Sequence, residues 1–156
     1  MTIPPANTSN QRWLAALAHA GILIPTFGLA APLVIWLAQR EKSAFLTFQA
    51  LQALAFQLLL AVAGVIGGFL SGFLVLGISL AAAALGIALQ SETPFMFMSG
   101  GVWLIFGLLL CALGLFVLSG LIAAIACAGG SNFRYPLLGD WLARYLTAAG
   151  TEDRHE

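Results

Sequence analysis

The chain carries no charged side chain between Lys42 and Glu92. One membrane-crossing helix needs only about 20 apolar residues, so this stretch is long enough for more than a single crossing. Charged residues make up 8% of the sequence, hydrophobic residues make up 61%, and the mean hydropathy is +0.99. Soluble domains carry about 25% charged residues, which is what covers their water-facing surface. The sequence therefore predicts an all-α, polytopic integral membrane protein and leaves no room for a soluble catalytic domain.

The first two predicted segments belong to a single membrane domain of residues 1–156. Residues 13–37 form the first segment, in which Trp13 and Trp36 would lie about 35 Å apart on a straight helix, as in an aromatic belt at each interface. Pro25 and Pro32 are predicted to kink this helix or unwind part of it. Residues 45–90 form the second segment, which is either one long helix or a hairpin of two crossings.

Small residues repeat at four-residue spacing in two places. Gly64, Gly68 and Gly72 would line one helix face, where another helix can pack closely, and this row favours an unbroken helix through residues 67–68. A polar break at residues 91–95 precedes the third segment, residues 101–128, where a second row consists of Gly120, Ala124 and Ala128. Residues 137–148 then have the pattern of a short amphipathic helix in the interface. The ends, residues 1–11 and 151–156, are predicted to be flexible.

Three long kinked transmembrane helices are the favoured topology, and four crossings remain the alternative. With three crossings Arg40, Lys42, Arg134 and Arg144 share one side, whereas Arg12 lies on the opposite side. Basic residues gather on the cytoplasmic side of membrane proteins, so the loop at Arg40 and the C-terminal tail are predicted to be cytoplasmic. The chain would thus be a multi-pass protein of the cell inner membrane.

Three glutamines stand at the start of the second segment. Gln49, Gln52 and Gln57 fall within about 140° of one another on a helical wheel, so they share one face of the helix. In a membrane such amides bond across to another helix, with about 0.6 to 2 kcal/mol for each bond. They could hold the bundle together, or they could line a polar groove for a passing segment or solute, and the sequence leaves both readings open.

Other chemistry is sparse in this sequence. His19 is an ionisable group inside an apolar segment, where it could titrate or reach interfacial water. Ser71 with His19 would be the minimum for an intramembrane protease, a remote alternative because no oxyanion element can be recognised. Cys111 and Cys127 fall on nearly opposite helix faces and have no metal-ligand spacing. We expect no catalytic residue, no metal and no cofactor, and six basic residues are too few for binding nucleic acid.

One group of residues follows a recognisable pattern at both ends of the chain. Its members are a histidine in the first segment, Pro-Leu-x-x-Trp-Leu at the end of that segment, a phenylalanine and glutamine series after the charged loop, and a closing Arg-Tyr-Pro: His19, Pro32, Leu33, Trp36, Leu37, Phe45, Phe48, Gln49, Gln52, Ala53, Gln57, Arg134, Tyr135 and Pro136. This pattern resembles the bacterial Tic-twenty-like family, which is similar to the twenty-kilodalton membrane component of the chloroplast inner-envelope import translocon. The resemblance implies about three hydrophobic segments and a connection to protein translocation.

Together these observations predict a small non-enzymatic inner-membrane protein that acts through helix–helix contacts. It would be a subunit or an assembly or translocation factor of a larger complex, in contact with the lipid bilayer, with other membrane proteins or with a second copy through the small-residue faces. An oligomeric channel or carrier is the alternative. Arg134 and Tyr135 are further predicted to clasp the entrance of the second segment beside Phe45 and Gln49, unless Arg134 only touches lipid.

Overall fold

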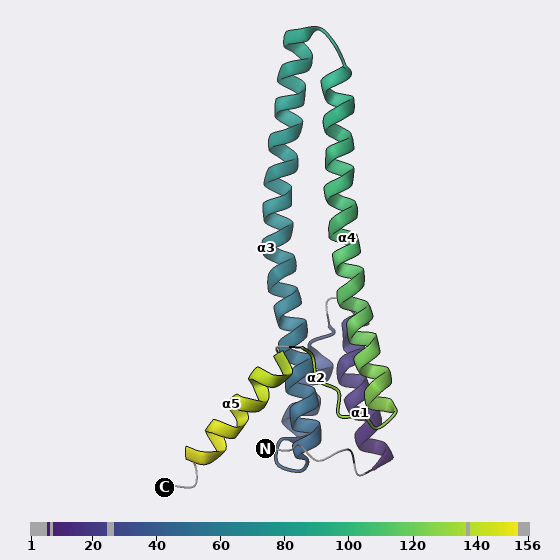
Figure 1. Ribbon diagram of the computed structural model, residues 1–156, viewed down its shortest axis with the longest axis vertical. Helices are drawn as coiled ribbons and strands as arrows, with labels where there is room; N and C mark the ends of the chain where they lie inside the picture. Colours follow the sequence, from purple (N-terminus) through teal and green to yellow (C-terminus); the bar gives the residue numbers. More distant parts are fainter. Residues whose placement is uncertain (1–5, 7, 25–26, 137, 153–156) are drawn as a thin grey trace. The chain divides into compact units, whose positions relative to one another are not determined.

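The computed structural model describes residues 6, 8–24, 27–136 and 138–152, and every element among them is helical (Figure 1). The elements in chain order are α1 (Ser9–Ala20), the short 3-10 helix η1 (Gly21–Leu23), α2 (Ala30–Gln39), α3 (Ala44–Leu89), α4 (Thr93–Ala128) and α5 (Leu138–Glu152). The all-α prediction is therefore confirmed for this part of the chain.

Two of these helices are long and apolar. The 46 residues of α3 and the 36 residues of α4 are each sufficient, by length and composition, to cross a membrane. At a rise of about 1.5 Å per residue, each exceeds the roughly 30 Å hydrocarbon core of a bilayer. As the glycine spacing predicts, α3 continues without interruption through residues 67–68. The reversal between the two helices occurs at Gln90, whose φ is 48°, and Ser91 Oγ accepts a 3.2 Å bond from the Thr93 backbone N–H.

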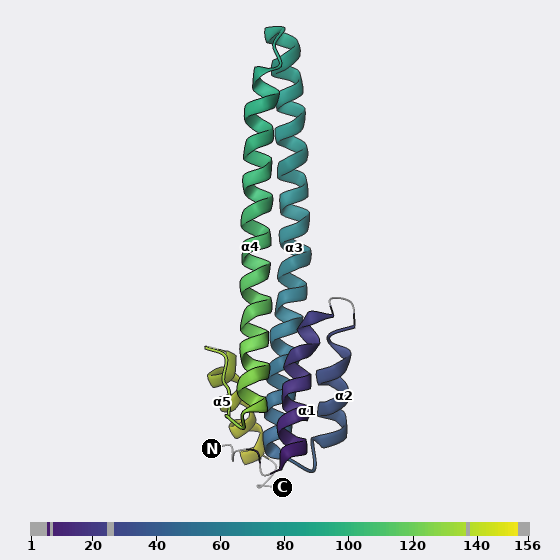
Figure 2. The same ribbon diagram turned by 90° about the vertical axis from the view of Figure 1, so that its right-hand side faces the viewer.

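The third long helix expected over residues 13–37 is not confirmed, because the structure divides this segment between α1, η1 and α2. The two α-helices lie side by side and run in opposite directions (Figure 2). The chain can reverse there because two glycine backbones meet: a Cβ atom on Gly21 would lie 2.6 Å from the carbonyl oxygen of Gly28. Pro25, which was expected to disturb a helix, lies outside the described residues.

Pro32 begins a helix rather than kinking one. It is the third residue of α2, in the first turn, where a missing backbone N–H leaves no bond unmade. Because α1 and α2 are antiparallel, Trp13 and Trp36 lie toward the same end of this pair and do not mark two opposite interfaces. Near the N-terminus, α1 begins at Ser9, within residues 1–11 that were expected to be flexible. The Thr8 side chain caps this helix, because its hydroxyl oxygen accepts a hydrogen bond from the Gln11 backbone N–H.

The chain forms two compact units. Unit 1 comprises Met1–Leu59 and Val117–Glu156, and contains α1, α2, α5, the start of α3 and the end of α4. Unit 2 comprises Leu60–Phe116, the hairpin made by the rest of α3 and α4. Large apolar side chains such as Phe73 and Trp103, 71% and 72% exposed, face outward from unit 2. Such a surface suits lipid, since a water-facing hairpin would not present it.

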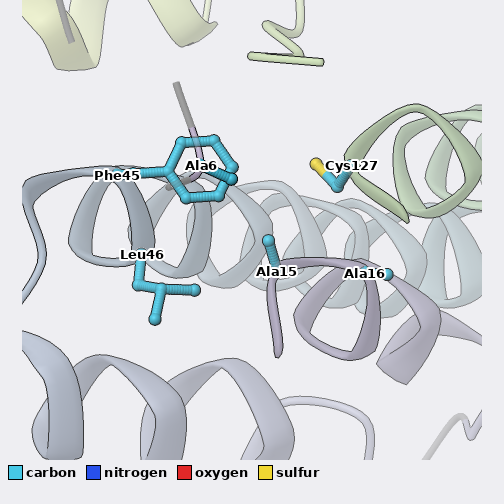
Figure 3. Packing of buried hydrophobic residues seen from close by; sticks show 6 residues of the cluster. All are labelled: Ala6, Ala15, Ala16, Phe45, Leu46 and Cys127. Atoms are coloured by element: carbon cyan, nitrogen blue, oxygen red, sulfur yellow. The ribbon is translucent and has the colours of Figure 1, made fainter. Parts of the chain in front are cut away.

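Small residues let the helices of unit 1 approach closely. One buried cluster joins α1, α3 and α4, and Figure 3 shows its members: Ala6, Ala15, Ala16, Phe45, Leu46 and Cys127. A second cluster is formed by Ala18, Ile35, Ala50 and Ala53. On α4, Gly120 accommodates Ile22 of η1, because a Cβ there would lie only 2.8 Å from Ile22 Cγ2. Membrane helices commonly pack through such alanine and glycine surfaces.

Candidate functional site

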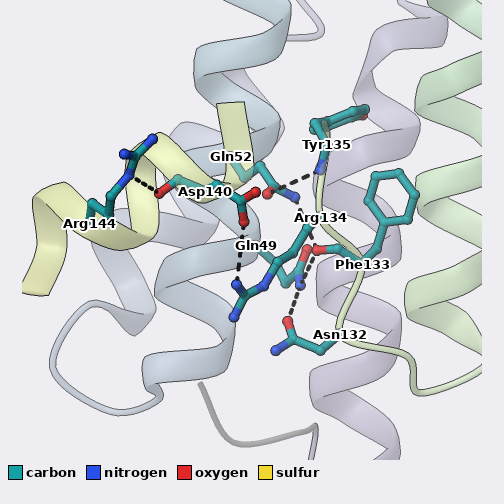
Figure 4. A network of polar contacts seen from close by, with 8 residues as sticks. All are labelled: Gln49, Gln52, Asn132, Phe133, Arg134, Tyr135, Asp140 and Arg144. Carbon is teal, nitrogen blue, oxygen red and sulfur yellow. Dashed lines mark hydrogen bonds and ion pairs between the residues drawn. The ribbon is translucent and has the colours of Figure 1, made fainter. Parts of the chain in front are cut away.

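The segment after α4, residues 131–136, runs as an extended strap beside the start of α3 (Figure 4). Gln49 Nε2 donates to Asn132 Oδ1 at 2.8 Å and to the Phe133 carbonyl at 3.0 Å. Gln52 Nε2 donates to the same carbonyl at 3.2 Å, and its Oε1 accepts from the Tyr135 N–H at 3.4 Å. The two amides thus satisfy backbone groups of the strap that have no helical partner, which a buried segment requires.

His19 connects α1 to this network. The ring is 1% exposed, with Nε2 3.1 Å from Gln49 Oε1 and Nδ1 3.2 Å from the Tyr135 hydroxyl. The amide nitrogen of Gln49 already donates to two carbonyl oxygens, so the atom that faces His19 is an acceptor. We therefore assign the ring proton to Nε2, which leaves Nδ1 to accept from the Tyr135 hydroxyl. The result is one directed chain of bonds from Tyr135 through His19 and Gln49 to Asn132.

Aromatic contacts hold Tyr135 in place. Its ring stacks on Phe56 with a centroid distance of 4.1 Å and an interplanar angle of 7°, and it meets the edge of His19 at 5.5 Å. Burial, and to a smaller extent the Cys127 thiol, raises the pKa of the Tyr135 phenol above its ordinary value. The neutral hydroxyl is thus the form that this site favours, in agreement with its role as a hydrogen-bond donor.

Gln57, the third amide, binds a different partner. Its Nε2 donates to the Ala18 carbonyl at 3.0 Å, near the end of α1, and its Oε1 is buried with no hydrogen-bond partner among the described residues. All three glutamines are buried, at 0%, 0% and 6% exposed for Gln49, Gln52 and Gln57. The amide face of α3 therefore holds two elements at once, the strap and the end of α1.

The outer side of the strap carries charge. The Arg134 guanidinium lies 5.6 Å from the centroid of the Phe48 ring, and its Nη1 is 3.6 Å from Asp140 Oδ1 on α5. This ion pair is largely exposed, so its contribution to stability is small. The first turn of α5 covers the network closely, since a Cβ on Gly139 would lie 2.5 Å from Gln52 Oε1. Farther along α5, Trp141 and Tyr145 stack on its exposed side at 5.8 Å.

Most of the residues singled out from the sequence meet at this site. Unit 1 brings together His19, Phe48, Gln49, Gln52, Gln57, Arg134 and Tyr135. Phe45 lies instead in the apolar cluster of Figure 3, and the exposed Pro136 ends the strap, where its carbonyl accepts from the Leu138 N–H.

The predicted clasp differs from the structure in one respect, because Tyr135 stacks on Phe56 rather than lying beside Phe45. Arg134 faces the carboxylate of Asp140, and the nearby Glu41 pairs with Arg40 at 3.7 Å.

Three participants were not identified from the sequence: Asn132, Phe56 and Cys127, whose Sγ lies 3.6 Å from Gln49 Oε1. Only Phe56 had a usable signal, because it follows Gln52 by four residues and so shares its helix face.

Arg12 is also placed differently from the prediction. Its guanidinium lies against Gly130 at the end of α4, where a Cβ would be 3.0 Å from Arg12 Cζ. Gly130 is followed directly by the strap that carries Arg134. The structure therefore places Arg12 beside the segment that leads to Arg134, because α1 and α2 fold back on each other instead of forming one long helix.

The geometry gives no support to the protease pairing. Both ring nitrogens of His19 are engaged, one with Gln49 and the other with Tyr135. Ser71 donates its hydroxyl at 3.1 Å to the Gly68 carbonyl of its own helix. Among the described residues there is also no group of three His, Cys, Asp or Glu side chains that could hold a metal ion. What this arrangement does chemically is to fix the strap through a neutral histidine and two amides.

Two helices long and apolar enough to cross a membrane, a short helical pair and a buried amide network make up an all-α protein with the composition of a membrane protein. Within that class the family can be stated, because residues 10–142 match the model of MamF/MmsF, the magnetosome magnetite crystal formation protein family. This match spans most of the chain, and the chain belongs to that family. Comparison with curated proteins and with solved structures gives no match.

The resemblance to the Tic-twenty-like family is therefore wrong, and the link to protein translocation falls with it. Glutamines, aromatic residues and prolines at helix ends serve packing and interfacial anchoring in many membrane proteins. The pattern that suggested the resemblance consists of these residue types, so it does not discriminate between families.

Proposed function

We propose that this chain is a non-enzymatic protein of the magnetosome membrane that takes part in magnetite crystal formation through contacts with other helices. The family match over residues 10–142 is the observation that carries the proposal. The family's description names crystal formation and no catalysed reaction. The two long apolar helices would supply the membrane anchorage, and the magnetosome membrane is a specialised invagination of the inner membrane, the location expected from the sequence.

Unit 2 offers a surface for such contacts. Gly64, Gly68 and Gly72 line an apolar groove of about 460 Å³ on α3, together with Val65 and Phe69 among others. A Cβ on any of these glycines would meet no atom within 4 Å. Packing among the described residues therefore gives no reason for glycine at these positions, where alanine would favour the helix by about 0.5 to 1 kcal/mol. Close approach of a helix from another protein, or from a second copy, would supply that reason.

The arrangement of unit 1 supports a common membrane side for the loop at Arg40 and the strap, residues 131–136. The strap touches the start of α3, a few residues after the loop at Arg40. We propose that both loops, with the C-terminal tail, face the cytoplasm. Cysteines introduced at Ser43 and Ser131 would then react with an impermeant maleimide from the cytoplasmic side of membrane vesicles, whereas opposite accessibility would refute the arrangement.

Deletion of the gene in its own cell tests the proposed function. Electron microscopy should show crystals that are fewer, smaller or altered in shape, and a plasmid copy of the parent sequence should restore them. A Ser71→Ala copy should restore them equally, since the proposal assigns no catalytic role to that hydroxyl. Crystals of unchanged number, size and shape in the deletion strain would refute the proposal.

A further inference from the structure

The enclosed contact between His19 and the strap favours an uncharged imidazole over a charged one. In the assigned tautomer Nδ1 accepts from the Tyr135 hydroxyl, while Nε2–H donates to Gln49. Protonation would make both ring nitrogens donors, so the hydroxyl would have to turn its own proton elsewhere in a site where the histidine is 1% exposed. A charged ring enclosed in this way is costly unless an acid faces it.

No acid does so among the described residues, since no carboxylate lies within ion-pair distance of the ring. From α3 the ring faces the amide of Gln49, and from α4 the Cys127 thiol reaches the same amide oxygen. From the strap it faces Tyr135 and the ring of Phe133. Arg134 turns away toward Phe48 and Asp140, and neither η1 nor α2 contains a titratable residue.

We propose that His19 and Tyr135 form a pH-sensitive latch, in which protonation of His19 releases the strap from the amide face of α3. The closed state binds the neutral ring, whereas the open state exposes the ring to solvent and accepts the proton. Histidine ordinarily titrates near pH 6.5. Below that pH, each unit of acidification shifts the ratio of open to closed molecules toward the open state by up to about tenfold.

Acidity is a natural signal for a protein with the proposed function. Magnetite forms when ferrous and ferric ions take oxide from water, and the protons of that water are released. This reading of the latch rests on the proposed function, but the latch itself does not. If purified protein shows no pH response, the latch is refuted but the proposed function is not. If the deletion strain forms normal crystals, the proposed function is refuted but the latch is not.

A nitroxide label on the strap tests the latch in the full chain. Ser131 is exposed and lies outside the hydrogen bonds described for the network, so Ser131→Cys in a Cys111→Ser background carries the label, and the buried Cys127 is left in place. The protein is kept in a nonionic detergent, whose headgroups do not titrate. Between about pH 7.5 and about pH 5, a range that brackets the ordinary histidine value, label mobility should rise reversibly. A label at Ser91→Cys in unit 2 should show no change.

The two histidines of the chain provide the matched pair of variants. His19→Gln should abolish the pH response, because glutamine stays neutral, whereas His155→Gln should leave it intact. A parent that does not respond, or a His19→Gln variant that responds like the parent, would overturn the latch. If the strap of His19→Gln is already mobile at neutral pH, the variant Tyr135→Phe provides the test. The latch predicts that the label in this variant becomes mobile at a higher pH than in the parent. A rise in mobility that does not depend on pH would overturn the latch.

Discussion

Replacement of Gln49 by leucine should loosen the whole of unit 1. Gln49 is fully buried, and its amide donates to Asn132 and Phe133 and accepts from His19. Leucine fills a similar volume on α3 but makes none of these bonds. The variant therefore leaves the His19 ring N–H inside the protein without its acceptor, while the Phe133 carbonyl keeps its bond from Gln52.

The decrease in the free energy of unfolding can be worked out from the hydrogen bonds that Gln49→Leu removes. Hydrogen bonds between membrane helices contribute about 0.6 kcal/mol on average and up to about 1.7 kcal/mol. An unpaired buried donor adds a penalty of about 1 to 3 kcal/mol. The three lost bonds to Asn132, Phe133 and His19 and the stranded His19 N–H together give an expected decrease of roughly 3 kcal/mol in the free energy of unfolding, and the fourth bond, from the weakly donating Cys127 thiol, adds little.

Reversible unfolding in mixed micelles, followed by tryptophan fluorescence, measures this decrease. The matched control is Gln39→Leu at the end of α2, where the same exchange is made on a partly exposed side chain outside the network. It should alter the free energy of unfolding by less than about 0.5 kcal/mol, as surface substitutions usually do. If Gln49→Leu is as stable as that control, the amide network does not hold unit 1 together.

Two further predictions follow from the same unit. Gly120→Val should lower the free energy of unfolding by about 1 to 3 kcal/mol more than Gly114→Val, because its side chain would overlap Ile22 whereas Gly114 has open space around it, and equal losses would contradict the packing. The raised pKa of Tyr135 means that its contribution to stability is complete below the ordinary tyrosine value near pH 10 and is lost as the pH rises above it, by up to about 1.4 kcal/mol for each pH unit. Unfolding measured between about pH 9 and pH 11 should show this decline in the parent and a smaller one in Tyr135→Phe, and equal slopes would refute the burial of the neutral phenol.

The long helices were predictable because their signal is local. An uncharged apolar stretch and glycines at four-residue spacing favour an unbroken α3 over a hairpin, and the polar residues that follow Leu89 mark its end. The reversal within residues 13–37 was not predictable in the same way. Composition cannot distinguish one kinked helix from two short antiparallel ones, because the choice depends on the approach of Gly21 to Gly28 and on packing against Gly120.

The candidate site was predictable only in part, for a related reason. Helical periodicity places Gln49, Gln52 and Gln57 on one face, and the polar character of that face indicates that it contacts protein rather than lipid. Periodicity does not say which segment arrives there. Asn132 and Cys127 enter the network through the long-range approach of α4 and the strap, more than 70 residues away along the chain.

The central claim, that this chain is a protein of the magnetosome membrane, is tested most directly by its location. Crystals purified with their surrounding membrane, and cytoplasmic membrane from the same cells, can be extracted with alkaline carbonate and probed for an epitope-tagged copy of the chain. We expect the chain to be enriched in the membrane around the crystals and to resist extraction, because α3 and α4 are long and apolar enough to cross a bilayer. Recovery only in the cytoplasmic membrane, or release by alkaline carbonate, would contradict the account.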